Sequence, residues 1–153
     1  MIVRFLHLLA LGYSIGAIVF FSFVIAPTVF QVLGREQAGD VVAVIFPRYY
    51  QLGIGAAAIA LVTAMALRGR GTARGAWTGS SVALAIGLAA TLWAGAVVEP
   101  RARQLRQEMH TAAPPAAAAE EFGHAHRLAV MLNGTALLAG LAALACASAG
   151  LRS

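Results

Sequence analysis

Four long stretches without a charged side chain dominate this sequence. They contain thirty, nineteen, twenty-four and twenty-four residues, at positions 5–34, 49–67, 75–98 and 128–151. About 20 residues of α-helix, at ~1.5 Å per residue, span the roughly 30 Å hydrocarbon core of a bilayer. Because backbone groups in lipid must be hydrogen-bonded within the chain, these stretches are expected to be helices rather than strands. The sequence therefore predicts an all-α integral membrane four-helix bundle.

The composition argues against a soluble domain. Of the 153 residues, 60% are hydrophobic and 11% are charged, against roughly 45–50% and about 25% in soluble domains. A soluble fold of this length could not hide so much apolar surface, whereas a bilayer removes the need to hide it. The net charge of +5 comes entirely from arginine, and in a membrane protein such charge reflects topology. We therefore expect a lipid bilayer as the partner and no nucleic acid.

Charged residues and prolines set the expected helix boundaries. A single transmembrane domain, 1–153, is expected, with helices at about 4–33, 47–68, 75–99 and 119–150. Pro27 should kink the first helix or end its regular part, because proline lacks the N–H that a helix interior uses. The external link 100–120 should begin with a short amphipathic helix that has Leu105 and Met109 on one side.

The arginines indicate the orientation of the chain. The loop 68–76 contains three arginines and no acid, and it lies on the same side as both termini. The opposite side carries six arginines and all six acids. Because short arginine-rich loops stay in the cytoplasm, both termini are expected to be cytoplasmic. The membrane is expected to be a bacterial inner membrane.

Polar residues gather at the end of the bundle opposite the termini. A polar group at membrane depth is costly and is by default a functional hypothesis. The candidate cluster consists of Arg48, Tyr49, Glu99, Arg101, His126 and Asn133. Arg48 and Glu99 lie at matching depths on neighbouring helices and are expected to form an ion pair. Tyr49 and Tyr50 also suit an interfacial aromatic belt, which would have no role in binding.

The histidines offer a second kind of site. His110, His124 and His126 occupy the same external region, and imidazole suits copper and zinc. His7 lies about one turn into the first helix and is a candidate ligand to haem or copper. The plainer alternative for each of them is a packing or interfacial histidine.

Other motifs favour packing over chemistry. No Ser/His/Asp arrangement, phosphate-binding glycine loop or pair of catalytic carboxylates is discernible, so a non-enzymatic protein is favoured. The lone Cys146 excludes a disulfide within the chain. The pairs Gly12/Gly16 and Gly75/Gly79 are small residues four apart, a spacing that lets membrane helices approach closely. They are interpreted as packing surfaces, with a homodimer as the alternative.

Four segments of the chain resemble the transmembrane protein 205-like family. They are VFFSFVIAPTVF (19–30), FPRYY (46–50), EPRAR (99–103) and FGHAHRLAVMLN (122–133). The positions that match the family's motifs are Phe46, Pro47, Tyr49, Glu99, Pro100, Arg101, Phe122, His126 and Asn133. Ala129 departs from the pattern, since the family often has serine there. The resemblance implies a four-helix membrane protein of unassigned role, with His126 as the meaningful histidine beside Glu99, Arg101 and Arg48.

The first helix carries a fainter resemblance. Leu6-His7, followed eight residues later by Gly16-Ala17, is similar to the opening helix of copper-resistance-D-like proteins and of haem-binding membrane proteins. It implies haem or copper at His7.

Three functions follow from these patterns. The first is a non-enzymatic membrane protein that binds a small solute, a metal ion or a partner at the polar cluster. The second is a haem- or copper-binding redox protein, with His7 or His126 as the ligand. The third is a purely structural bundle whose polar residues only join its helices.

Overall fold

The computed structural model describes residues 1–69, 73–111 and 115–152, and all of its regular structure is helical. The elements are α1 (Ile2–Phe20), η1 (Phe21–Ile25), α2 (Ala26–Val32), α3 (Arg35–Arg68), α4 (Arg74–Trp93), η2 (Ala94–Val98), α5 (Glu99–Met109) and α6 (Ala118–Arg152). The predicted all-α class is confirmed. Arg70, in the predicted basic loop, and residues 112–114, in the predicted link, lie outside the described residues.

Within the described residues, four continuous rods are long and apolar enough to cross a membrane. They are Ile2–Val32, Arg35–Arg68, Arg74–Met109 and Ala118–Arg152, with 31 to 36 residues each. At ~1.5 Å per residue, rods of this length measure about 46–54 Å, well beyond a hydrocarbon core of roughly 30 Å. Part of the bundle therefore extends past the hydrocarbon core.

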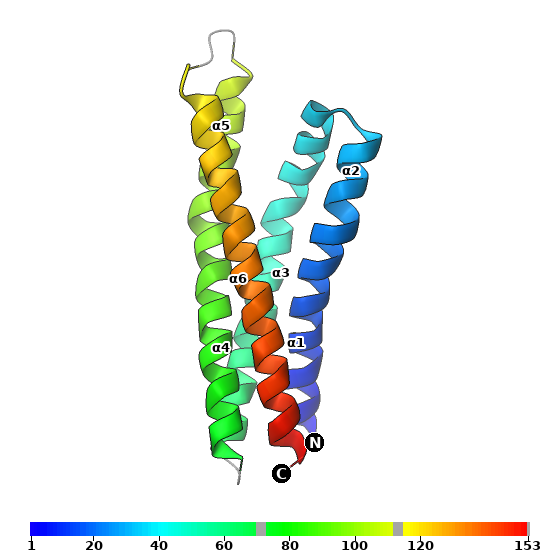
Figure 1. The fold of residues 1–153 in the computed structure, drawn as a ribbon, viewed down its shortest axis with the longest axis vertical. Coiled ribbons are helices and arrows are strands. Elements are labelled where there is room, and N and C mark those ends of the chain that lie inside the picture. Colours follow the sequence, from blue (N-terminus) through cyan, green and yellow to red (C-terminus); the bar gives the residue numbers. More distant parts are fainter. Residues whose placement is uncertain (70–72, 112–114, 153) are drawn as a thin grey trace.

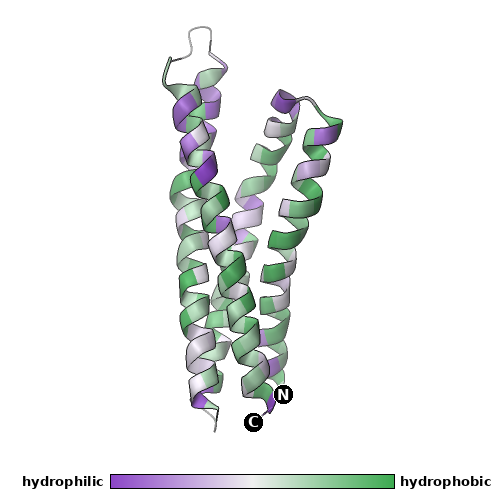
Figure 2. Ribbon diagram, in the orientation of Figure 1, coloured by the Kyte–Doolittle hydropathy of each residue, from purple (hydrophilic) through white to green (hydrophobic). Residues whose placement is uncertain are grey.

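The rods pack as a bundle that is closed at one end and splayed at the other (Figure 1). Around the bundle, α1 contacts α3, α3 contacts α4, α4 contacts α6 and α6 contacts α1. Both termini lie at what we call the closed end, together with Arg68 and Arg74. Towards the opposite end, the open end, α2 stays with α3 and α5 stays with α6, while the two pairs diverge. Hydrophilic residues gather at the two ends, and the length between them is largely hydrophobic (Figure 2).

Two helices differ from the expected boundaries. The second begins at Arg35 rather than near residue 47, and Pro47 lies inside it. The helix extends towards the N-terminus through the apolar residues before Pro47, although the expected segment began at residue 47. The expected short helix after the third span is α5, but it is continuous with α4 through η2 rather than separate from it.

Each π-helical turn ends two residues before a proline. Phe21–Ile25 precedes Pro27, and Ala94–Val98 precedes Pro100. Proline cannot donate to the carbonyl four residues earlier and its ring crowds that carbonyl. A wider π-helical turn relieves the clash, and such turns are frequent at functional sites. The expected interruption near Pro27 is present, and a second one occurs before Pro100.

The closed end is filled by small residues around a few large ones. Leu11, Ala60, Ala64 and Ala143 are fully buried there, and Trp77 is 3% exposed. Small side chains let membrane helices approach closely, so van der Waals contact replaces the hydrophobic effect as the source of association.

Only some of the predicted packing glycines have neighbours in the chain. A Cβ added at Gly79 would lie 3.0 Å from the Sγ of Cys146. Gly12, Gly16 and Gly75 have nothing within 4 Å of such an atom. Helix spacing alone could not show which face of each helix turns inward.

Candidate functional site

A cavity of about 1040 Å³ lies at the open end, between the α2/α3 pair and the α5/α6 pair. We call it the cleft. Its walls come from α1, η1, α2, α3, η2, α5 and α6, so residues far apart in the sequence share one space. Of the predicted polar residues, Tyr49, Glu99, His126 and Asn133 line it.

Aromatic rings form the inner wall of the cleft. The Phe21 ring lies 5.2 Å from Phe46 and 4.9 Å from Tyr49, and Tyr49 lies 5.2 Å from Tyr50, all measured between ring centroids. Phe21 belongs to the π-helical turn η1, and a Cβ on Gly95 in η2 would lie 2.8 Å from the Tyr50 Cβ. Tyr50 is 5% exposed, so it packs inside the bundle rather than in an interfacial belt.

A hydrogen-bonded chain crosses the base of the cleft. The Tyr49 hydroxyl donates to Asn133 Oδ1 at 2.7 Å, and Asn133 Nδ2 donates to the Ser22 hydroxyl at 3.1 Å. The chain connects α3, α6 and η1. It therefore joins two predicted site residues and adds Ser22.

Glu99 is paired within its own helix and not with Arg48. The Glu99 side chain is 6% exposed, and Arg103 donates to it through Nε at 3.0 Å and through Nη2 at 2.5 and 2.7 Å. The predicted Arg48–Glu99 ion pair is wrong, because the helix continues through Glu99 and places Arg103 one turn away. Arg48 is exposed and does not line the cleft.

Arg101 lies outside the cleft. Its guanidinium contacts the Glu121 carboxylate at 2.5 Å, and both side chains are about half exposed. This ion pair connects α5 to α6 on the outer surface, where exposed pairs stabilise little. The predicted cluster of six therefore separates into four residues that share the cleft and two that do not.

The histidines are distributed over separate places. His126 lines the cleft and stacks on Phe122, with ring centroids 6.4 Å apart and planes 17° apart. His124 is exposed, and its Nδ1 accepts from Arg127 at 3.0 Å. His110 Nε2 lies 3.1 Å from the Glu36 carboxylate. Within the described residues, no three His, Cys, Asp or Glu side chains form a group that could hold a metal ion, so a shared His110/His124/His126 site is not assembled.

His7 is buried at the closed end, in α1. Its Nδ1 lies 3.0 Å from the Ala60 carbonyl, which can only accept, so this nitrogen carries the proton. The ring packs edge-on against Trp77 at a centroid distance of 5.4 Å. Nε2 is buried and has no hydrogen-bond partner among the described residues. His7 therefore belongs to a second location, apart from the cleft.

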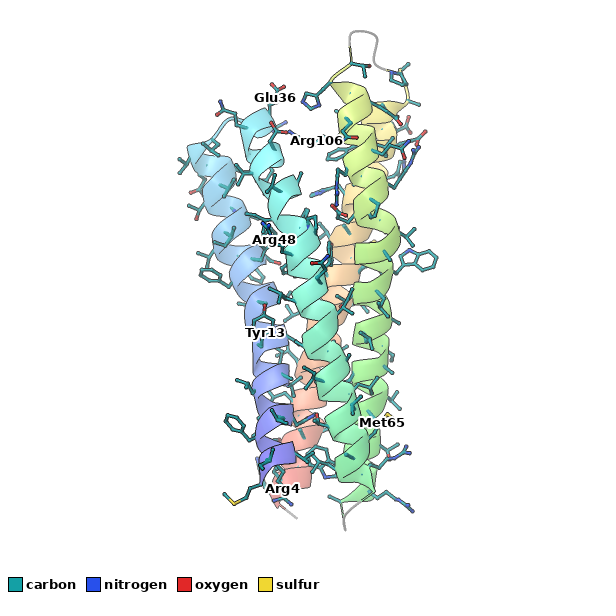
Figure 3. The ribbon with its side chains drawn as sticks, turned by 180° about the vertical axis from the view of Figure 1, so that it is seen from behind. Arg4, Tyr13, Glu36, Arg48, Met65 and Arg106 are labelled. Atoms are coloured by element: carbon teal, nitrogen blue, oxygen red, sulfur yellow. The ribbon has the colours of Figure 1, made fainter. Side chains whose placement is uncertain are left out.

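A clasp that the sequence did not reveal joins α3 to α5 at the open end. Arg106 donates to the Asp40 carboxylate through Nε at 3.1 Å and Nη2 at 3.0 Å, and to the Glu36 carbonyl at 2.5 Å. Figure 3 shows Glu36 and Arg106 near each other at this end. A Cβ on Gly39 would collide with the Arg106 guanidinium. We call Glu36, Gly39, Asp40 and Arg106 the clasp.

A second, small void continues into the bundle below the cleft. Its volume is about 40 Å³, and Tyr49 and Asn133 line it as well as the cleft. Ser14 and Thr91 also line it, and each hydroxyl donates to the carbonyl four residues earlier in its own helix. A void of this size is large enough for water, so polar groups extend inward from the base of the cleft.

Most of the missed residues leave little trace in the sequence. Arg103 could be found, since it follows Glu99 by four residues on a helix. Ser22 and Asn133 are 111 residues apart, and Asp40 and Arg106 are 66 apart. Only the packing of the helices brings such residues together.

Comparison with known proteins gives a family but no activity. The family model described as "Domain of unknown function (DUF4149)" matches residues 9–111. An uncharacterized protein of Aquifex aeolicus (strain VF5) is 53% identical over 49 residues. That alignment covers 32% of this chain and 37% of the Aquifex protein, so the chain spans well under two thirds of this relative. No solved structure matches the chain.

Proposed function

The chain belongs to the DUF4149 family, whose function is unknown, and we propose that it is a multi-pass membrane protein that binds a small molecule in the cleft. The observation that carries the proposal is the cavity of about 1040 Å³ with both aromatic and polar walls. Sites for small ligands are concave, about 300–1,000 Å³ in volume, and mostly apolar with a few placed polar groups. The cleft has each of these properties.

The polar groups of the cleft suit recognition. Tyr49 and Asn133 hold each other in position, and Arg103 holds Glu99 in the same way. Side chains fixed by neighbours present donors and acceptors in a defined geometry, which gives orientation to a bound molecule. His126 adds a further donor or acceptor on the α6 wall.

We also propose that the chain is related to the transmembrane protein 205-like family, whose motif positions group together in space. Of the nine matching motif positions, six line the cleft, namely Phe46, Tyr49, Glu99, Phe122, His126 and Asn133. Three motifs that are distant in the sequence thus meet around one space. The kinship would be dropped if other DUF4149 members carried unrelated residues at these six positions.

Bound haem or copper at His7 is a second candidate function, and one observation favours it. The Nε2 atom of His7 is buried and has no partner among the described residues, and a buried nitrogen lone pair is a possible metal ligand. Purified protein with a Soret band or stoichiometric copper, lost in His7→Phe, would support this function. Protein without either would remove it.

The proposed orientation places both termini in the cytoplasm of a bacterial inner membrane. At the closed end the described residues include Arg4, Arg68, Arg74 and Arg152 and no acid. Single cysteines at Arg74 and His110, in a Cys146→Ser background, would test it. An impermeant maleimide applied from outside should label position 110. Labelling at position 74 alone would reverse the orientation.

The cleft can be tested by filling it. Ala129 lines the cleft on α6, whereas Ala142 is exposed on the same helix and does not line it. We expect a small molecule to copurify with the protein, detectable by native mass spectrometry. Ala129→Trp should lower its occupancy about tenfold, which corresponds to roughly 1.4 kcal/mol, and Ala142→Trp should leave it unchanged. Equal occupancy in both variants would overturn the proposal and favour a purely structural polar cluster.

A further inference from the structure

The two open sides of the cleft differ in how they are bridged. On the side where α3 faces α5, the clasp connects the helices through three hydrogen bonds from Arg106. On the side where α2 faces α6, the described residues show no hydrogen bond or ion pair between these helices. The Ser22–Asn133 bond lies on that side as well, but it joins η1 to α6 at the base of the cleft. Side-chain hydrogen bonds therefore connect the two helix pairs on one side of the cleft only.

The side where α2 faces α6 carries exposed apolar side chains that also line the cleft. Phe30 on α2 is 47% exposed, Val130 on α6 is 58% exposed, and Phe23 below them in η1 is 69% exposed. Residues that face both the cleft and the outside mark a continuous opening. In a membrane-spanning chain, exposed phenylalanine and valine are stable when they face lipid.

The position of the cleft along the membrane normal agrees with an opening towards lipid. Arg48 precedes Arg68 by twenty residues, so at ~1.5 Å per residue the two are about 30 Å apart along α3. That length equals the hydrocarbon core, which places Tyr49 and the base of the cleft at the far edge of the core. The base of the cleft then lies where the acyl chains meet the headgroups, and the rest of the cleft lies at the level of the headgroups of that leaflet.

Two arginines of the cleft, Arg35 and Arg103, offer N–H donors that no carboxylate uses among the described residues. The carboxylate of Glu99 pairs with Arg103, that of Glu36 lies beside His110, and Arg106 pairs with Asp40. Arg35 also lines the cleft, and no ion pair of it occurs among the described residues. Arg103 uses Nε and Nη2 for Glu99, which leaves its Nη1 for another acceptor. An anionic group is the complement of such a wall.

From these observations we infer that the ligand of the cleft is an anionic phospholipid of the surrounding leaflet, which enters sideways between α2 and α6. Its acyl chain packs against Phe21 and Phe23 near the base of the cleft, and its headgroup phosphate faces Arg103 and Arg35 above them. The clasp closes the opposite side. This inference rests on the proposed function and names the ligand class and the entry route.

The test uses the full chain in phosphatidylcholine nanodiscs with a trace of photoactivatable lipid. The probe carries its photoreactive group on the acyl chain and has either a phosphatidylglycerol or a phosphatidylcholine headgroup. After irradiation, peptide mapping should find the phosphatidylglycerol probe on cleft residues such as Phe21 and Ala129. The phosphatidylcholine probe should label mainly bilayer-facing residues such as Leu52 and Ile59, which are exposed and lie outside the cleft.

A paired substitution tests the headgroup contact. Glu99→Gln with Arg103→Gln removes the ion pair as a unit, so neither charge is left buried alone. Labelling of the cleft by phosphatidylglycerol should fall about tenfold, as expected for the loss of a charge-assisted hydrogen bond. Arg101→Gln, which removes an arginine outside the cleft, should leave the labelling unchanged. Circular dichroism and thermal unfolding of each variant would show that the fold is retained.

Each other outcome has a distinct meaning. Equal labelling of the cleft by both probes would overturn the anionic headgroup, and labelling confined to bilayer-facing residues would overturn lipid entry. If lipid probes fail but another molecule copurifies and is lost in Ala129→Trp, this inference is wrong and the proposed function stands. If no molecule of any kind occupies the cleft, both are wrong.

Discussion

The same four helical rods form the closed and the open end of this bundle, but they pack differently at the two ends. At the closed end, alanines and glycines bring the helices together around Leu11 and Trp77, and His7 is fully buried. At the open end, aromatic rings and two π-helical turns accompany a cavity of about 1040 Å³. The comparison shows how one bundle can combine a tightly packed end with an end that contains a cavity. Small residues permit close approach at the closed end, whereas large aromatic rings fill the space between helices at the open end.

The largest expected effect is the loss of packing at the closed end. Trp77→Ala should lower the free energy of unfolding by about 3–5 kcal/mol, because it removes a large buried side chain and leaves a void. Trp93 is 56% exposed on the same helix, against 3% for Trp77, so Trp93→Ala is the matched control and should change little. Reversible unfolding in mixed micelles would measure both. Equal losses would mean that the closed end is not the stabilising half of the bundle.

A smaller effect is expected where the wall of the cleft is tightest. Gly95→Ala would place a Cβ 2.8 Å from the Tyr50 Cβ, an atom that cannot move without its backbone. We expect a loss of about 1–3 kcal/mol in unfolding free energy, typical of overpacking. Gly55→Ala is the control, since nothing lies within 4 Å of its added Cβ. A neutral Gly95→Ala would show that the aromatic wall can shift and that the open end is less defined than its contacts indicate.

The hydrogen-bonded chain at the base of the cleft should contribute less still. Tyr49→Phe keeps the ring but removes the donor to Asn133 Oδ1, and the expected cost is about 1 kcal/mol. Tyr13→Phe is the control, because Tyr13 is exposed and its hydroxyl has no hydrogen bond among the described residues. If the two variants unfold alike, the chain from Tyr49 to Ser22 does not stabilise the open end. A loss of ligand without a loss of stability would instead assign Tyr49 to recognition.

The smallest effect on stability is expected at the clasp, where ion pairs are partly exposed and contribute about 0–1 kcal/mol. Gly39→Ala should displace the Arg106 guanidinium, while Gly34→Ala has open space around its added Cβ. The readout is a cysteine at Val42, which lines the cleft and is 8% exposed, in a Cys146→Ser background.

Displacing the clasp should let an impermeant maleimide reach position 42 up to about fivefold faster in Gly39→Ala than in Gly34→Ala, as for a gate weakened by roughly 1 kcal/mol. If the two rates are equal, the clasp does not close this side of the cleft. The two ends of the bundle would then differ in packing alone and not in access.

Local patterns were enough to predict part of this structure. The interruption near Pro27 follows from the chemistry of one residue. Phe122, His126 and Asn133, which the family resemblance singled out, all line the cleft, because their spacing places them on one face of α6. The Arg48–Glu99 pair was wrong because depth along the membrane does not show which way a side chain points. The start of the second helix was misplaced because Pro47, taken as a boundary, is accommodated inside α3.

By itself the sequence determined the four apolar segments, the all-helical fold and the presence of polar residues at the end opposite the termini. These properties depend only on the hydropathy and the spacing of residues along a single helix. They can therefore be read from a short segment of the sequence. Only the tertiary structure decided that Tyr49, Asn133 and Ser22 meet, that Arg106 reaches Asp40, and that a cleft opens between two helix pairs. The physical reason is that hydropathy does not fix the rotation of a membrane helix about its own axis. In lipid, every face of an apolar helix can contact the acyl chains. Close packing of small residues between helices therefore sets which face turns inward.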